Sequence, residues 1–188
     1  MIKKLISHPG GPGKEEKLLF DHLENVANMC RDKIMNDDVN CSLFDKQIVA
    51  DLVFTIGLLH DFGKSTIYFQ DYIRLPDDKK RTYQLTKYKN HSVLSAIIAF
   101  NVIKENFDSE LLAYQAFQVI YRHHGDLIDF NQSDNENFYS HTILKKQLKN
   151  ICNYPAVEKF YTQFDISLSL AENISLELFQ DFLENTDN

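Results

Sequence analysis

Apolar residues recur at helical spacing through most of the chain and predict a series of helices. Leu19, Leu23, Val26 and Cys30, for example, form one apolar stripe. The expected helices cover residues 14–35, 44–62, 66–74, 90–106, 109–124, 141–151, 156–163 and 174–184. No segment of useful length alternates apolar and polar residues as a strand would, so we predict an all-α fold, a compact helical bundle.

Polar or helix-breaking stretches separate these helices. Residues 1–13 contain a Pro- and Gly-rich run and are expected to form an irregular lead-in that could fold over the core. Residues 75–90 are expected to be a basic loop, and residues 126–140 a polar loop of a length common at binding edges. No break in composition demands two domains, so we interpret residues 1–188 as a single domain.

The charge of the chain is acidic overall but unevenly distributed. A formal net charge of −7 argues against a general nucleic-acid binder, yet residues 74–89 carry a local net charge of +4. A solvated loop is the simplest interpretation of this basic segment. The alternative is that nearby aromatic rings stack the bases of a single strand. These rings belong to Tyr68, Phe69, Tyr72, Tyr83 and Tyr88, interleaved with Arg74 and the lysines.

Nothing in the sequence indicates export or a membrane. The longest apolar runs have only about eight residues, well short of the ~20 needed to cross a bilayer, and the N-terminus lacks the apolar region of a signal peptide. Cys30, Cys41 and Cys152 are scattered and form no Cys-x-x-Cys pair. We therefore expect a cytoplasmic protein with no membrane partner.

The strongest chemical signal lies where the most apolar helix ends, in the run Gly57-Leu58-Leu59-His60-Asp61-Phe62-Gly63-Lys64. A carboxylate drawn towards the interior needs a proton, hydrogen bonds or a cation, and the adjacent imidazole makes a metal ion a plausible cation. By itself, the His-Asp pair more often indicates a hydrogen-bonded histidine of the core than a metal ligand.

Further histidines occupy faces or ends of other expected helices that are otherwise apolar. They are His22, His91, His123 and His124. Buried separately, these imidazoles and His60 would each need their own hydrogen-bond partners, whereas a shared metal centre satisfies them together. Imidazole nitrogen with one carboxylate suits Mn, Fe, Co, Ni or Zn better than Mg or Ca.

Four motifs resemble, in order and spacing, those of the HD superfamily. They are residues 18–27 (Leu-Leu-Phe-Asp-His-Leu-Glu-Asn-Val-Ala), His60-Asp61-Phe62-Gly63-Lys64, residues 90–96 (Asn-His-Ser-Val-Leu-Ser-Ala) and His123-His124-Gly125. More narrowly, residues 7–127 resemble the HD nuclease domain of the CRISPR type I effector helicase-nuclease. This resemblance implies an HD-type bundle with a metal site in the core between helices. It also implies a nuclease that cuts single-stranded DNA with metal-activated water in CRISPR interference.

The resemblance also implies a role for each matching residue. One metal ion would be held by His22, His60 and Asp61, and a second by Asp61 with three histidines, which are His91, His123 and His124. Asp61 would then bridge two divalent transition metal ions, which we expect to be Mn, Fe, Co or Ni before Mg or Zn. Asp61 and Lys64 are the expected catalytic residues, with Lys64 near the scissile phosphate. A cation at a helix end is the simpler interpretation of Lys64.

One expected ligand is not found. The family usually completes the first metal site with a late aspartate in a run resembling Ser-x-Leu-x-x-Ala-Asp. Asp165 and Asp181 are the late carboxylates available, but neither has matching neighbours, so this run would lie beyond the end of the chain. This difference bears on the occupancy of the first metal site and, through it, on activity.

The resemblance implies three partners: single-stranded DNA, a helicase subunit and the CRISPR surveillance complex. Because the helicase motor is absent, the chain would be a stand-alone subunit or a fragment. Two alternatives stay open: an HD phosphohydrolase acting on nucleotides or cyclic nucleotides, and a catalytically degenerate HD docking module. His8 and His141 match no motif and are interpreted as surface or loop histidines. Ser92 and Ser95 are interpreted as small residues that allow close helix packing.

Overall fold

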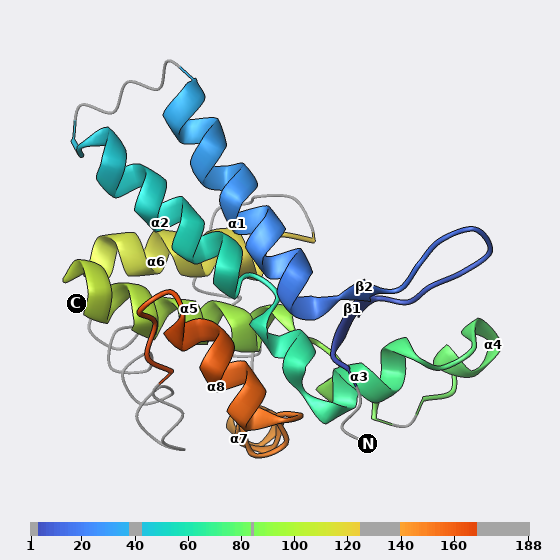
Figure 1. The fold of residues 1–188 in the computed structure, drawn as a ribbon. Coiled ribbons are helices and arrows are strands. Elements are labelled where there is room, and N and C mark those ends of the chain that lie inside the picture. Colours follow the sequence, from blue (N-terminus) through green and yellow to red (C-terminus); the bar gives the residue numbers. More distant parts are fainter. Residues whose placement is uncertain (1–3, 38–42, 84, 125–139, 169–188) are drawn as a thin grey trace.

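A computed structural model describes residues 4–37, 43–83, 85–124 and 140–168 (Figure 1). Helices dominate these residues, which confirms the predicted all-α class. They are α1 (Leu19–Asn36), α2 (Lys46–Leu59), α3 (Ile67–Ile73), α4 (Asp77–Lys80), α5 (Ser92–Phe107), α6 (Glu110–Tyr121), α7 (His141–Lys149) and α8 (Tyr154–Thr162), with short 3₁₀ helices η1 (Phe62–Ser65) and η2 (Thr86–Tyr88). The helix expected over residues 174–184 lies outside the described residues.

Helices α1 and α2 pack side by side as an antiparallel pair whose far end extends beyond the other helices (Figure 1). Gly57 of α2 permits this approach, because a Cβ atom there would lie only 2.5 Å from Cα of Ala27 in α1. The close packing brings His22 of α1 towards His60, which caps the C-terminus of α2.

Helix α5 forms the centre of the core and packs against α2, α6 and η1. Every residue from Val93 to Ile103 is buried, as expected for a helix that is apolar on nearly all sides. Asp108 ends α5 in the left-handed conformation, and Ser109 then caps α6 by accepting a hydrogen bond from the Leu112 amide. This tight reversal returns the chain, so that the C-terminus of α6 lies near the start of α5.

Helices α7 and α8 support the segment that follows α2. The amide of Cys152, between these helices, donates to the carbonyl of Ser65. The amide of Ile67 donates to the backbone carbonyl of Asn150. From α8, the buried Tyr161 hydroxyl donates to the carbonyl of Leu58 at 2.9 Å. Tyr161 thereby satisfies one of the carbonyls that the last turn of α2 leaves without a partner.

The lead-in is not wholly irregular, so that prediction was wrong in part. Strand β1 (Ile6–His8) pairs antiparallel with β2 (Lys17–Leu18), and α1 consequently begins at Leu19 rather than near residue 14. Gln70 fixes β1 through both amide atoms, since its Nε2 donates to the Ile6 carbonyl and its Oε1 accepts from the Ile6 amide. Such short strands, held by a distant side chain, produce no periodic pattern.

The expected basic loop over residues 75–90 contains α4 and η2, so that prediction was also wrong in part. Pro76 precedes α4, acidic residues occupy its first turn and lysines its last, an order that favours even a single helical turn. Of the polar loop expected over residues 126–140, only Ser140 lies within the described residues. None of the helices in the described ranges has the length and apolar character needed to cross a membrane.

Candidate metal centre

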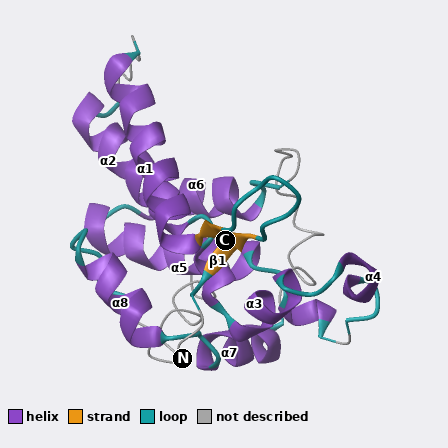
Figure 2. Ribbon diagram, turned by 45° about the vertical axis from the view of Figure 1, so that its right-hand side comes forward, coloured by secondary structure: helices purple, strands orange, loops and turns teal. Residues whose placement is uncertain are grey.

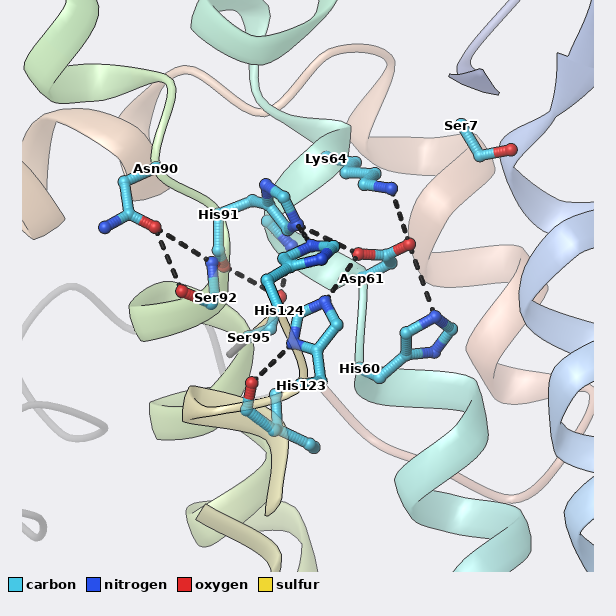
Figure 3. Close-up of polar contacts among 12 residues, drawn as sticks. Ser7, His60, Asp61, Lys64, Asn90, His91, Ser92, Ser95, His123 and His124 are labelled. Atoms are coloured by element: carbon cyan, nitrogen blue, oxygen red, sulfur yellow. Dashed lines mark hydrogen bonds and ion pairs between the residues drawn. The ribbon is translucent and has the colours of Figure 1, made fainter. Parts of the chain in front are cut away.

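The carboxylate of Asp61 lies at the point where α1, α2, α5 and the end of α6 meet (Figure 3). Its side chain is only 2% exposed. It follows the last residues of α2 and precedes η1, so the sharp turn between the two helices directs it inwards. An ionised carboxylate this deeply buried requires compensation from several neighbours.

The two oxygens of Asp61 face different groups of side chains. Oδ2 lies 3.0 Å from Nε2 of His22 and 3.3 Å from Nε2 of His60. Oδ1 lies 3.1 Å from Nε2 of His91 and 3.4 Å from Nε2 of His123. His124 joins the second group, with its Nε2 atom 2.9 Å from that of His91. Figure 3 shows His91, His123 and His124 on one side of Asp61 and His60 on the other.

The structure therefore brings together every residue that the sequence indicated as a metal ligand, in the predicted grouping. The first set contains His22, His60 and Asp61, and the second contains Asp61, His91, His123 and His124. Within each set the candidate ligand atoms lie within 4.8 Å of one another, close enough to surround one ion.

Two backbone carbonyls fix the tautomers of His60 and His123. Nδ1 of His60 lies 2.7 Å from the carbonyl of Gly57, and Nδ1 of His123 lies 2.5 Å from that of Ile120. Since a carbonyl only accepts, Nδ1 carries the proton in both rings. In the neutral rings Nε2 then presents a lone pair to Asp61, which is the form that binds a metal ion.

Two buried atoms in the second set lack a hydrogen bond. Oδ1 of Asp61 and Nε2 of His123 are close together, yet neither has a partner with hydrogen-bond geometry. An oxygen and a nitrogen lone pair that face each other in a buried site repel unless a cation lies between them. The residues present therefore fit a divalent metal ion.

A family model described as Cas3, HD domain matches residues 7–182. The chain belongs to the Cas3 HD domain family. The match continues well beyond residue 127, where the resemblance visible in the sequence ended, so it includes α7 and α8. Membership supports an HD-type, metal-dependent nuclease role. Neither the comparison with curated proteins nor that with solved structures yields a match.

In this Cas3 HD domain, the environment of the centre shifts several pKa values in the direction that favours metal binding. Burial raises the pKa of Asp61, but the contacts with Nε2 of His22 and of His91, at 3.0 and 3.1 Å, lower it by more, so the carboxyl group stays ionised. Burial, with repulsion from His123 and His91, lowers the pKa of His124 to about 4. Burial likewise lowers the pKa of His91. Both imidazoles are thus neutral near pH 7 and able to coordinate.

Lys64, an expected catalytic residue, is not a solvated cation at a helix end. Its ammonium group is buried and lies 2.7 Å from Oδ2 of Asp61, on the side of the first set. The ring of Phe69 is 5.5 Å from the same nitrogen. Lys64 therefore forms a buried ion pair with the carboxylate of Asp61.

Gly63 and Ser95 connect the HD motif to the helix that carries His91. A Cβ atom on Gly63 would lie 2.4 Å from the carbonyl oxygen of His91, so only glycine allows this contact. The Ser95 hydroxyl accepts from the Gly63 amide at 2.9 Å and donates to the His91 carbonyl at 2.9 Å. Ser95 is fully buried, which agrees with its interpretation as a packing residue.

His8 lies beside the centre, which the sequence did not predict. It is exposed on β1, as interpreted, but its ring packs edge-on against His22 with centroids 5.2 Å apart. Burial, with the nearby Lys64 and His22, lowers its pKa. The contact depends on the pairing of β1 with β2, for which the sequence carries no local signal.

The described residues supply no late carboxylate to either set. Asp165 is exposed and lies after α8 in the left-handed conformation, outside both groups. Asp181 and Gly125 lie outside the described residues, as does the side chain of His141.

Proposed function

We propose that the chain hydrolyses phosphodiester bonds of single-stranded DNA at a centre of two metal ions, as the HD component of CRISPR type I interference. The observation that supports this most strongly is the division of the Asp61 carboxylate, whose two oxygens face two separate histidine sets. Family membership supports the nuclease class. The proposed partners are a helicase subunit and the CRISPR surveillance complex.

We assign His22, His60 and Asp61 to the first ion and Asp61, His91, His123 and His124 to the second. Imidazole ligands favour Mn, Fe, Co or Ni over Mg. Two such ions, when bound, lower the pKa of a water molecule and neutralise charge on a phosphate group. No side chain of the protein is then needed as a nucleophile.

The residues of the chain contribute orientation and charge. The Gly57 and Ile120 carbonyls hold His60 and His123 in the coordinating tautomer. Lys64 forms an ion pair with the carboxylate of Asp61 and would lie beside a phosphate held at the first set. His124 is exposed whereas Asp61 is buried, so substrate would approach from the side of the second set.

The activity test compares three substrates with the purified chain across Mn, Fe, Co, Ni, Zn and Mg. We expect cleavage of circular single-stranded DNA in Mn, Fe, Co or Ni, and its loss in Asp61→Asn. Turnover of a cyclic dinucleotide or a nucleotide without cleavage of DNA would instead support the small-substrate phosphohydrolase. A chain that binds no transition metal and cleaves none of the three would be the docking module.

A further inference from the structure

The fold joins two basic segments that are far apart in the sequence. Residues 74–83 and 85–89 meet α7 at η2, which contacts both α3 and α7. Figure 2 shows α7 below α3, with α4 to their right. The buried Gln147 of α7 donates to the carbonyls of Tyr88 and Asn90 at 2.9 and 2.7 Å. Lys146 of α7 lies 3.3 Å from the hydroxyl of Tyr88. We call the surface formed by residues 74–83, 85–89 and α7 the basic face.

The basic face is positively charged, although the chain as a whole is negatively charged. Its two segments contain nine Lys or Arg residues and two Asp residues, a net charge of +7, whereas the whole chain carries −7. Helix α7 has no acidic residue, and its three lysines are exposed. Because Lys and Arg near phosphates supply most of the affinity for nucleic acid, this local charge matters more than the total.

Half-exposed aromatic rings lie among these cations. Nζ of Lys89 is 4.1 Å from the ring centroid of Tyr72, and the rings of Tyr72 and Tyr83 are 5.7 Å apart. Tyr68 stacks on Tyr88 at 4.8 Å. Tyr88 and Phe69 are buried, which removes two of the five rings considered for base stacking. Tyr68, Tyr72 and Tyr83 remain accessible in part.

The basic face adjoins the second metal set. Lys89 is two residues before His91, and Gln147 anchors the backbone between them to α7. The ring of Phe69, in the same helix as Tyr72, packs edge-on against that of His91 at 4.9 Å. A strand bound along the face would thus reach the side of the centre on which His124 is exposed.

We propose that the basic face binds the single strand that the metal centre cleaves, with phosphates at Lys89 and Lys146 and a base against Tyr72. The identity of the bound strand rests on the proposed function. The place where it binds rests on the charge, exposure and position of these residues.

The test is the affinity of the full chain for a fluorescent single-stranded oligonucleotide, measured by anisotropy in EDTA so that no cleavage occurs. Lys89→Ala and Lys146→Ala should each weaken binding several-fold and reduce the dependence of log Kd on log salt by about 0.7 for each phosphate that is no longer neutralised. Tyr72→Ala should weaken binding roughly tenfold because the base no longer stacks, with an unchanged salt dependence.

Two controls keep the result specific. Lys33→Ala removes an exposed lysine at the far end of α1 and should leave both Kd and the salt dependence unchanged. Lys89→Arg keeps the charge and should retain the affinity. Equal affinities of the wild type, Lys89→Ala and Lys146→Ala would overturn the proposal, and so would absence of oligonucleotide binding by the wild type.

Hydrolysis of bis(p-nitrophenyl) phosphate by the wild type separates this proposal from the proposed function. Turnover of that diester together with unaltered DNA binding by the basic-face variants would contradict only the binding face. DNA binding that the variants weaken, without hydrolysis of any phosphodiester in any metal, would contradict only the nuclease.

Discussion

At the scale of single residues, the groups around Asp61 compensate the negative charge of its buried carboxylate. Its two oxygens are surrounded by four imidazoles and one ammonium group, and the carboxylate itself is buried. Lys64 brings a formal positive charge to within 2.7 Å of the carboxylate. Lys64 and Asp61 therefore form a buried ion pair, to which a bound metal ion would add further positive charge.

The substitution Lys64→Met tests this balance. Methionine fills a similar volume but leaves the buried carboxylate without its ion-pair partner, so the metal-free protein should lose about 3–5 kcal/mol of unfolding free energy. Added Mn should raise the melting temperature of the variant more than that of the wild type. Equal stability of the two metal-free proteins in urea would show that Lys64 does not compensate Asp61.

His124 gives the metal-free protein a predictable pH dependence. Its folded pKa of about 4 lies below the value of 6.5 expected in the unfolded chain. Between these values the unfolded chain takes up a proton that the folded protein does not, so stability falls as the pH drops from about 6.5 towards 4. NMR titration of the imidazole checks this directly, and a midpoint near 6.5 would contradict it.

The candidate ligands could be predicted from the sequence because each histidine interrupts an otherwise apolar helical face or helix end. His22 does so beside Leu19 and Leu23, and His60 at the end of α2. His8 could not be predicted, since its place depends on β1, a strand held by the side chain of Gln70 from α3. The roles of the candidate ligands in metal binding stay a prediction.

At the scale of elements, the centre depends on how closely η1 approaches the start of α5. Gly63→Ala tests that approach, because the added methyl group would overlap the backbone of His91. We expect a lower melting temperature and a weaker second metal site. Gly11→Ala is the matched control, since a Cβ atom there meets nothing within 4 Å. A similar small effect of both substitutions on metal affinity would show that this close approach does not position His91.

The helices were more predictable than the segments between them. The core of α5 follows directly from its continuous apolar sequence. Helix α4 was missed because one turn with acidic residues first and lysines last has no apolar face. The contact between residues 74–89 and α7 also has no local signal, since it is made by Gln147 across the fold.

At the scale of the whole molecule, the net charge of −7 misrepresents the surface beside the centre. The sequence argued against a general nucleic-acid binder, and this remains compatible with a nuclease whose basic residues are concentrated on the basic face. The same distribution predicts strong salt dependence of any DNA binding. Membership of the Cas3 HD domain family and the grouping of five histidines around one carboxylate agree on the class of chemistry.

The bridging role of Asp61 is tested most directly by counting metal ions per chain in matched variants, by elemental analysis after loading with Mn or Ni. We predict about two ions in the wild type, about one in His22→Ala or His123→Ala, and nearly none in Asp61→Asn. Two ions retained by Asp61→Asn, or none bound by the wild type, would contradict it.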